Sequence, residues 1–245
     1  MSKKGQGMSQ KSMSQNSPAE KSERQKAIGV ICLLLAAIVT SVALIDVPVS
    51  LLFQSTPQWL HVVMRNCSRI GDSSWSIPLS LLLVAVFGFR ARITEGATQS
   101  LARRRRNASL FVLTNVAVSG LVTVALKGII GRARPGVAGP GESLSFHPFI
   151  HSSDWASFPS GHTTTGVALA LSLAMLFPRA RPVLVAVAAL VGLSRVVLDV
   201  HWVSDTFAGA LVAFVTLQLL VPIFRQLCAS GYRLQGAPRG QIVSA

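Results

Sequence analysis

Long apolar stretches without charge divide this chain, and they constrain its fold more than any other feature. The first runs from Ala27 to Ile45, close to the roughly 20 residues that an α-helix needs to cross a bilayer core. Half of the 245 residues are hydrophobic and only 13% are charged, a balance typical of integral membrane proteins rather than soluble domains. The sequence therefore predicts an all-α integral membrane protein.

Five further apolar segments are expected to span: Trp75–Phe89, Ala108–Leu126, Thr163–Phe177, Pro182–Leu193 with its continuation, and Asp205–Phe224. The prediction is a bundle of six transmembrane helices over residues 27–226, between a disordered basic tail at 1–26 and a short tail at 227–245. Ser41-Val42-Ala43 is a passable cleavage site, so cleavage of the first segment as a signal peptide is an alternative. The basic lead is, however, too long for an ordinary signal.

Between the first two spans the pattern changes. Thr56 and Pro57 predict the N-cap and the first residue of a short helix, and Gly71 predicts its end. Apolar residues recur in this segment at helical spacing: Leu60, Val63, Met64, Cys67 and Ile70. This spacing favours an amphipathic helix that lies in the membrane interface.

The positive charges assign the sides of the membrane. The formal net charge of +14 is compatible with nucleic-acid binding, but the cations lie in short runs between apolar segments, as membrane topology requires. Most of the 23 lysines and arginines fall in four places: the N-terminal tail, an expected cytoplasmic loop at residues 90–106, an expected turn at residues 178–181 and the C-terminal tail. The positive-inside rule then predicts two cytoplasmic termini. The basic composition and the absence of eukaryotic signals favour a bacterial inner membrane. The cations left on the outer side are Arg65, Arg69, Lys127, Arg132, Arg134 and Arg195.

The stretch from Ser194 to Asp205 is the first of three polar clusters on that outer side. His201 and Asp205 are four residues apart, so their side chains would meet on one helical turn. A carboxylate that accepts one imidazole N–H leaves the other nitrogen free to attack, and Arg195 adds a charged fork suited to phosphate. An ordinary polar helix end with a satisfied histidine is the alternative.

Two clusters lie upstream. Lys127 and Arg134 are expected on one face of the third span, which Pro135 would stop. Ser160-Gly161 opens the fourth span with outward N–H groups that suit an anion, and His162 beside them is placed to donate a proton. Snorkelling cations and an ordinary N-cap would explain either cluster alone. Together, the three clusters predict a phosphate-transfer site, with no metal-ligand grouping outside them.

The three clusters resemble the pattern of the type 2 phosphatidic acid phosphatase family. The matching motifs are Lys-x6-Arg-Pro at 127–135, Pro-Ser-Gly-His at 159–162 and Ser-Arg-x5-His-x3-Asp at 194–205, without departure. The similarity covers roughly residues 27–224. It implies the helical core that this family shares with haloperoxidases, and hydrolysis of a lipid phosphate or diphosphate through a phosphohistidine, without metal or other cofactor.

The resemblance also implies roles for single residues. His201 would be the nucleophile and Asp205 its orienting partner, while His162 would act as general acid and then as base for water. The residues implied to hold the phosphate are Lys127, Arg134, Ser160, Gly161 and Arg195. Arg132 and Asp199 lie within the motifs but outside the pattern. Asp199, four residues from Arg195, is expected only to restrain it.

Several alternatives and details remain open at this level. Vanadate-dependent haloperoxidases share the pattern but are larger and soluble; a lipid phosphotransferase and a non-enzymatic transporter are further alternatives. The candidate substrates are undecaprenyl diphosphate, phosphatidylglycerol phosphate, phosphatidate and lipid A phosphate, and nothing indicates the oligomeric state. The segment 136–158 carries Phe146, Phe149, Ile150, Trp155 and Phe158. It is expected to dip into the outer interface and guide acyl chains, or else to cap the bundle.

Overall fold

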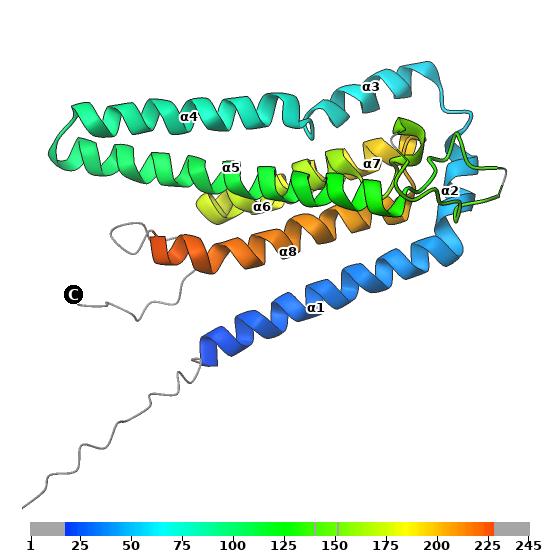
Figure 1. The fold of residues 1–245 in the computed structure, drawn as a ribbon, viewed down its shortest axis with the longest axis horizontal. Coiled ribbons are helices and arrows are strands. Elements are labelled where there is room, and N and C mark those ends of the chain that lie inside the picture. The colour runs from blue at the N-terminus through cyan, green and yellow to red at the C-terminus, as the bar shows by residue number, and fades with distance from the viewer. Residues whose placement is uncertain (1–17, 140, 151, 228–245) are drawn as a thin grey trace, which may run out of the picture.

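The computed structural model describes residues 18–139, 141–150 and 152–227, and the regular elements of this part are helices (Figure 1). They are α1 (Pro18–Thr40), α2 (Asp46–Phe53), α3 (Gln58–Arg69), α4 (Ser73–Ile93), α5 (Gly96–Ile130), α6 (Gly161–Leu176), α7 (Arg181–Val197) and α8 (Val203–Leu227). A π-helical turn, η1 (Ser41–Ile45), joins α1 to α2, and η2 (Ser153–Trp155) and η3 (Pro178–Ala180) are 3₁₀ turns. The all-α prediction is confirmed.

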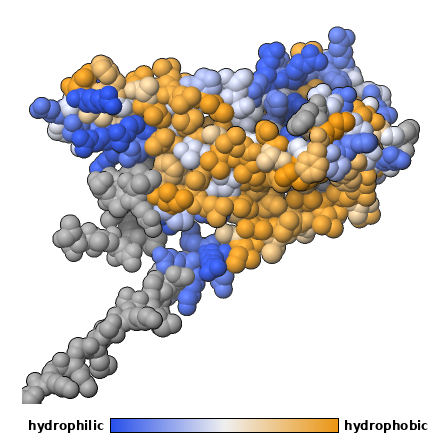
Figure 2. All heavy atoms as spheres, viewed as in Figure 1, coloured by the Kyte–Doolittle hydropathy of each residue, from blue (hydrophilic) through white to orange (hydrophobic). Residues whose placement is uncertain are grey.

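Within the described residues, five helical segments are long and apolar enough to cross a membrane: Glu20–Phe53, Gln58–Ile93, Gly96–Ile130, Pro178–Val197 and Val203–Arg225. Helix α6 is also apolar but shorter, with 16 residues. Apolar side chains cover the middle of the bundle in Figure 2, and hydrophilic ones gather toward its ends. The chain is thus a multi-pass membrane protein, and the crossing by α6 stays a prediction.

Two boundaries differ from the sequence predictions. Helix α1 begins at Pro18, so residues 18–26 are helical where a disordered tail was expected; residues 1–17 and 228–245 lie outside the described residues. The arginine-rich stretch 90–106 is not a loop, because α4 continues to Ile93 and α5 begins at Gly96. Arginine has a high helix propensity, so a basic run readily extends a helix beyond the apolar segment.

Helix α3 is the short amphipathic helix that the sequence predicts, shifted slightly along the chain. Pro57, rather than Thr56, is its N-cap, and its last residue is Arg69. Trp59 and Val62 are exposed, whereas Ser68 on the opposite side is buried where α3 packs against α7. Its place in the membrane interface stays a prediction.

The helices pack lengthwise, so the three sequence clusters meet at one end of the bundle. Helix α4 runs back along α5, α6 packs against α5, α7 and α8, and α1 lies against α8. Apolar clusters fill the middle: Phe111 with Leu217, Val221 and Phe224, and Val112 with Val116, Ala168 and Ala213. At the end shown on the right in Figure 1, α2, α3 and the segment 131–160 lie together.

Gly209 is the residue where α8 comes closest to the start of α6. A Cβ atom at this position would lie 2.6 Å from the Ser160 carbonyl oxygen and 3.0 Å from Thr164 Oγ1. Because a real Cβ essentially never comes so close to a backbone oxygen, α8 depends on glycine here to reach α6.

We therefore expect Gly209→Ala to destabilise the protein. Overpacking of this kind costs about 1–3 kcal/mol, which corresponds to a melting temperature lower by roughly 2–12 °C in a chain of this size. Gly120→Ala in α5 is the matched control, since nothing lies within 4 Å of the added methyl group and alanine favours a helix. Thermal unfolding in detergent measures both. Equal melting temperatures for the two variants would contradict the close approach.

Candidate active site

Helix α5 ends earlier than Pro135, at Ile130. Gly131 follows in the left-handed conformation (φ 58°, ψ 47°), and its N–H donates to the Lys127 carbonyl oxygen at 2.9 Å, a common way to end a helix. Lys127 is therefore in the last helical turn, while Arg134 lies beyond the helix. The prediction that both project from one helical face is wrong.

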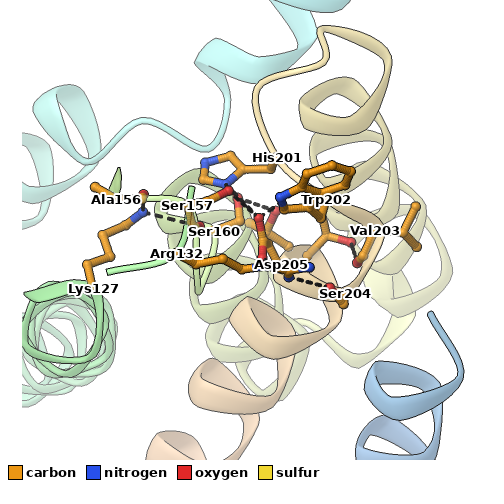
Figure 3. A network of polar contacts seen from close by, with 12 residues as sticks. Lys127, Arg132, Ala156, Ser157, Ser160, His201, Trp202, Val203, Ser204 and Asp205 are labelled. Atoms are coloured by element: carbon orange, nitrogen blue, oxygen red, sulfur yellow. Dashed lines mark hydrogen bonds and ion pairs between the residues drawn. The ribbon is translucent and has the colours of Figure 1, made fainter. Parts of the chain in front are cut away.

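The segment 131–160 is folded back on itself by backbone hydrogen bonds. Ala133 N–H donates to Ser145 O at 2.9 Å, and Ser157 N–H donates to Arg132 O at 3.1 Å. This fold brings Ala156 and Ser157 to Lys127, whose Nζ donates to the Ala156 carbonyl oxygen (Figure 3). Lys127 of the first motif is therefore held by the residues that lead into the second motif.

The second motif opens α6, as predicted. Ser160 is the N-cap of the helix, and its N–H donates to the backbone oxygen of Asp205 at 3.0 Å. A Cβ on Gly161 would lie 3.9 Å from Lys127 Cε, so the free N-terminal end of α6 faces that cation. His162 is half-buried, within electrostatic range of Lys127 and Arg195.

His201 and Asp205 are brought together, but not on one helical turn. Helix α8 begins at Val203, so His201 lies in the connection before it. Its Nδ1 is 3.4 Å from Asp205 Oδ2. The same carboxylate oxygen accepts from Ser157 Oγ at 2.5 Å and from Trp202 N–H at 2.9 Å. His201 and Asp205 are 3% and 0% exposed, so this contact is shielded from water.

Burial sets the protonation state of His201. Desolvation lowers its pKa to about 4; the hydrogen bond and charge of Asp205 oppose this effect, and the charges of Lys127 and Arg195 add to it. Since pH 5–8 lies above this pKa, the imidazole is neutral in that range. The ionised Asp205 accepts a hydrogen bond, so Nδ1 carries the proton and Nε2 keeps a free lone pair.

The cations of the first and third motifs have unused donors. Arg195 Nη1 donates to Ser68 Oγ of α3 at 2.6 Å. The Nε atoms of Arg134 and Arg195 are buried, and neither has a hydrogen-bond partner in the described part of the chain. Burial lowers the pKa of Arg134, while Asp154 and Asp205 raise it; an arginine nevertheless stays protonated. Unpaired guanidinium donors of this kind are suited to an oxyanion.

Sequence reasoning missed the most buried part of the site. The guanidinium of Arg132, 2% exposed, donates to Asp205 Oδ1 at 2.7 Å and to Asp46 Oδ2 at 2.8 Å. Asp46 also accepts from the N–H of Ser204 at 2.9 Å. A lone carboxylate directly after an uncharged span is itself a signal of a functional site, and that signal pointed to Asp46.

Asp199 does not restrain Arg195 as expected. Its Oδ1 accepts a hydrogen bond from Ser50 Oγ of α2 at 2.8 Å. No ion pair joins it to Arg195 within the described residues. The reason is local: Asp199 has a positive φ of 50°, which takes it out of the α7 helix before the i,i+4 geometry is reached.

Taken together, the sequence-predicted residues converge on one place. A neutral imidazole with a carboxylate partner, a second imidazole, three cations and a helix N-terminus form a site that can bind an anion and attack it. In residues 18–139, 141–150 and 152–227 no group of three or more His, Cys, Asp or Glu side chains could hold a metal ion.

Comparisons with known proteins agree with this geometry. Residues 108–227 match the model of the PAP2 superfamily. The chain is 36% identical over 183 residues to a lipid A 1-phosphatase of Rhizobium etli, covering 73% of this chain and 77% of that protein. It is 29% identical over 162 residues to phosphatidylglycerophosphatase B of Bacillus subtilis, covering 62% and 68%.

A solved structure shows the same fold. The crystal structure of a transmembrane PAP2-type phosphatidylglycerolphosphate phosphatase from Bacillus subtilis superposes with a TM-score of 0.57 at 23% identity, covering 86% of this chain and 99% of that one. With the membrane-spanning helices and the three motifs at one end of the bundle, these matches identify the chain as a membrane lipid phosphatase that belongs to the PAP2 superfamily.

Proposed function

We propose that this enzyme hydrolyses a lipid phosphate or diphosphate at the outer face of a bacterial inner membrane, through a phosphohistidine and without a metal ion. The observation that carries the proposal is the buried, neutral His201, held by Asp205. Around it lie cations with donors that have no partner among the described residues. Phosphoryl transfer needs this combination of a positioned nucleophile and positive charge on the phosphate oxygens.

In the first step His201 Nε2 attacks phosphorus, and the P–O bond to the lipid breaks. Burial, followed by the charge of Arg195, lowers the pKa of His162 to about 4, and a bound dianionic phosphate raises it again. His162 then donates a proton to the leaving oxygen. Positive charge develops on His201 as the N–P bond forms, and Asp205 stabilises that charge through Nδ1–H. Lys127, Arg134, Arg195, Ser160 and the N–H of Gly161 hold the other phosphate oxygens.

In the second step the neutral His162 takes a proton from water, and the hydroxide attacks phosphorus. The P–N bond breaks, inorganic phosphate leaves, and His201 returns to its neutral form. His162 again carries the proton that the next turnover needs, so the cycle consumes one water and no other reactant.

The names of two relatives support an order among the candidate substrates. The names of the two curated relatives point to lipid A that carries a 1-phosphate and to phosphatidylglycerol phosphate. We place the 1-phosphate of lipid A first, because that relative is the more similar over a longer part of the chain. Undecaprenyl diphosphate and phosphatidate are the further candidates.

Phosphate release by the purified enzyme tests this proposal. We expect release from lipid A 1-phosphate that continues in excess chelator, and loss of release in His201→Ala. Loss of activity in chelator that a divalent cation restores would contradict the mechanism, and transfer of the phosphate to another lipid would make the enzyme a phosphotransferase. Spheroplasts test the orientation: a membrane-impermeant phosphate ester should be hydrolysed without permeabilisation.

The segment 136–158 supports a role in lipid access. Its apolar side chains divide into two groups: Leu144 and Phe149 are 63% and 73% exposed, whereas Trp155 packs edge-on against His147 with ring centroids 4.4 Å apart. The packed Trp155 agrees with a segment that caps the bundle, and the exposed Leu144 and Phe149 agree with a segment that lies in the interface. We propose that the exposed group lies in the outer interface and guides acyl chains to the site.

Substitution of Phe149 tests this role. Phe149→Ser should raise KM for a long-chain lipid phosphate several-fold and leave KM for a short soluble phosphate ester unchanged, because only the former needs the interfacial contact. Phe177→Ser is the matched control, since Phe177 is 60% exposed in the turn at the opposite end of the bundle. A similar rise for both esters, or the same effect in the control, would favour the structural cap.

A further inference from the structure

The buried network below His201 contains one carboxylate more than the three motifs account for. Asp46 lies at the start of α2, outside residues 108–227 that match the family model. It is 1% exposed and ion-paired with Arg132. Arg132 in turn pairs with Asp205 and stacks over the Trp202 ring, with its Cζ 5.4 Å from the ring centroid. One guanidinium is therefore shared by two carboxylates.

Hydrogen bonds fix the position of the Arg132 guanidinium between Asp46 and Asp205. Arg132 Nη1 donates to Asp205 Oδ1 and to Ser204 Oγ, both at 2.7 Å. Its Nη2 donates to Asp46 Oδ2, and its Nε donates to the Ser143 carbonyl oxygen at 2.9 Å. Ser204 Oγ donates to Asp46 Oδ2 at 2.6 Å. Arg132 is thus held from both sides, and it holds Asp205 Oδ1 while Oδ2 faces His201.

The charges of this cluster matter because water is excluded. If Arg132 faced Asp205 alone, the pair would be neutral, and Asp205 would offer little net charge to an imidazole that becomes positive. Asp46 supplies the second negative charge, so that the three groups together keep one net negative charge beside His201. In a medium of low polarity such a difference acts strongly on a neighbouring ring.

We propose that Asp46 is a positioning residue for the hydrolysis proposed above: it compensates the charge of Arg132, so that Asp205 keeps its negative charge for His201. The first membrane helix thereby becomes part of the active site through α2, although it carries none of the three motifs. Ser50 lies one helical turn further along α2, and its hydroxyl donates to Asp199 in the connection between α7 and α8. This contact adds no charge.

The first arm of the test is kinetic. Asp46→Asn keeps the shape but removes the charge, and we expect kcat/KM for a soluble phosphate ester to fall roughly tenfold, the equivalent of about one pKa unit at His201. Ser50→Ala is the matched control: it removes an α2 contact to the same connection without changing charge, and we expect less than a twofold change. An Asp46→Asn enzyme with wild-type kcat/KM would overturn the proposal.

The second arm does not depend on activity. Outside the cluster of Asp46, Arg132 and Asp205, the charged groups that face His201 are Lys127 and Arg195, and the variants leave both of these and Asp205 in place. With histidine labelled for NMR and the His201 signal assigned by its loss in His201→Asn, Arg132→Gln should raise the pKa of His201 by about one unit. Adding Asp46→Asn to Arg132→Gln should lower it again, toward the wild-type value.

The outcomes separate this proposal from the proposed function. Loosened packing cannot move the pKa up in one variant and down again when a second change is added, so the predicted pair of shifts requires the field of Asp46. The same pKa in Arg132→Gln and in the double variant would overturn the proposal. A wild-type protein that releases no phosphate from any ester, yet shows both shifts, would instead contradict the proposed function.

Discussion

A buried carboxylate that must stay ionised organises this end of the molecule. Asp205 is fully buried, and burial of an unpaired charge would cost several kcal/mol. Four donors offset that cost: Arg132, Ser157, the backbone of Trp202 and, at longer range, His201. They come from the connection between α5 and α6 and from the residues before α8, so satisfying one carboxylate also sets the fold of both connections.

The residues proposed for nucleophilic attack are more deeply buried than those proposed to bind the phosphate. His201, Asp205 and Arg132 are almost fully buried, where electrostatic interactions are strong. Lys127, Arg134, His162 and Arg195 are half-buried, and they are the residues that we propose to contact the headgroup. Ser68 links Arg195 to α3, so an amphipathic helix with exposed apolar side chains is attached directly to a proposed phosphate-binding residue.

The sequence predicted what depends on local pattern. Hydropathy located the apolar helices, and motif spacing identified residues that the fold brings together, because both signals lie within short segments. The end of α5 was misplaced, since Gly131 ends the helix through a left-handed conformation before Pro135 is reached. The pairing of Arg132 with Asp46 joins positions 86 residues apart. No periodicity or spacing encodes such a contact, which arises only when α2 packs beside the start of α8.

The most direct test of this account is to find which histidine carries phosphate. In His162→Ala, attack on an activated ester such as p-nitrophenyl phosphate needs no proton donor, but hydrolysis of the intermediate lacks its base, so the phosphoenzyme should accumulate. After an alkaline quench, mass spectrometry of the peptides should place the phosphate on His201, and the double variant His162→Ala/His201→Ala should carry none. Phosphate on any other residue of His162→Ala, or undiminished turnover of the activated ester by His201→Ala, would contradict the account.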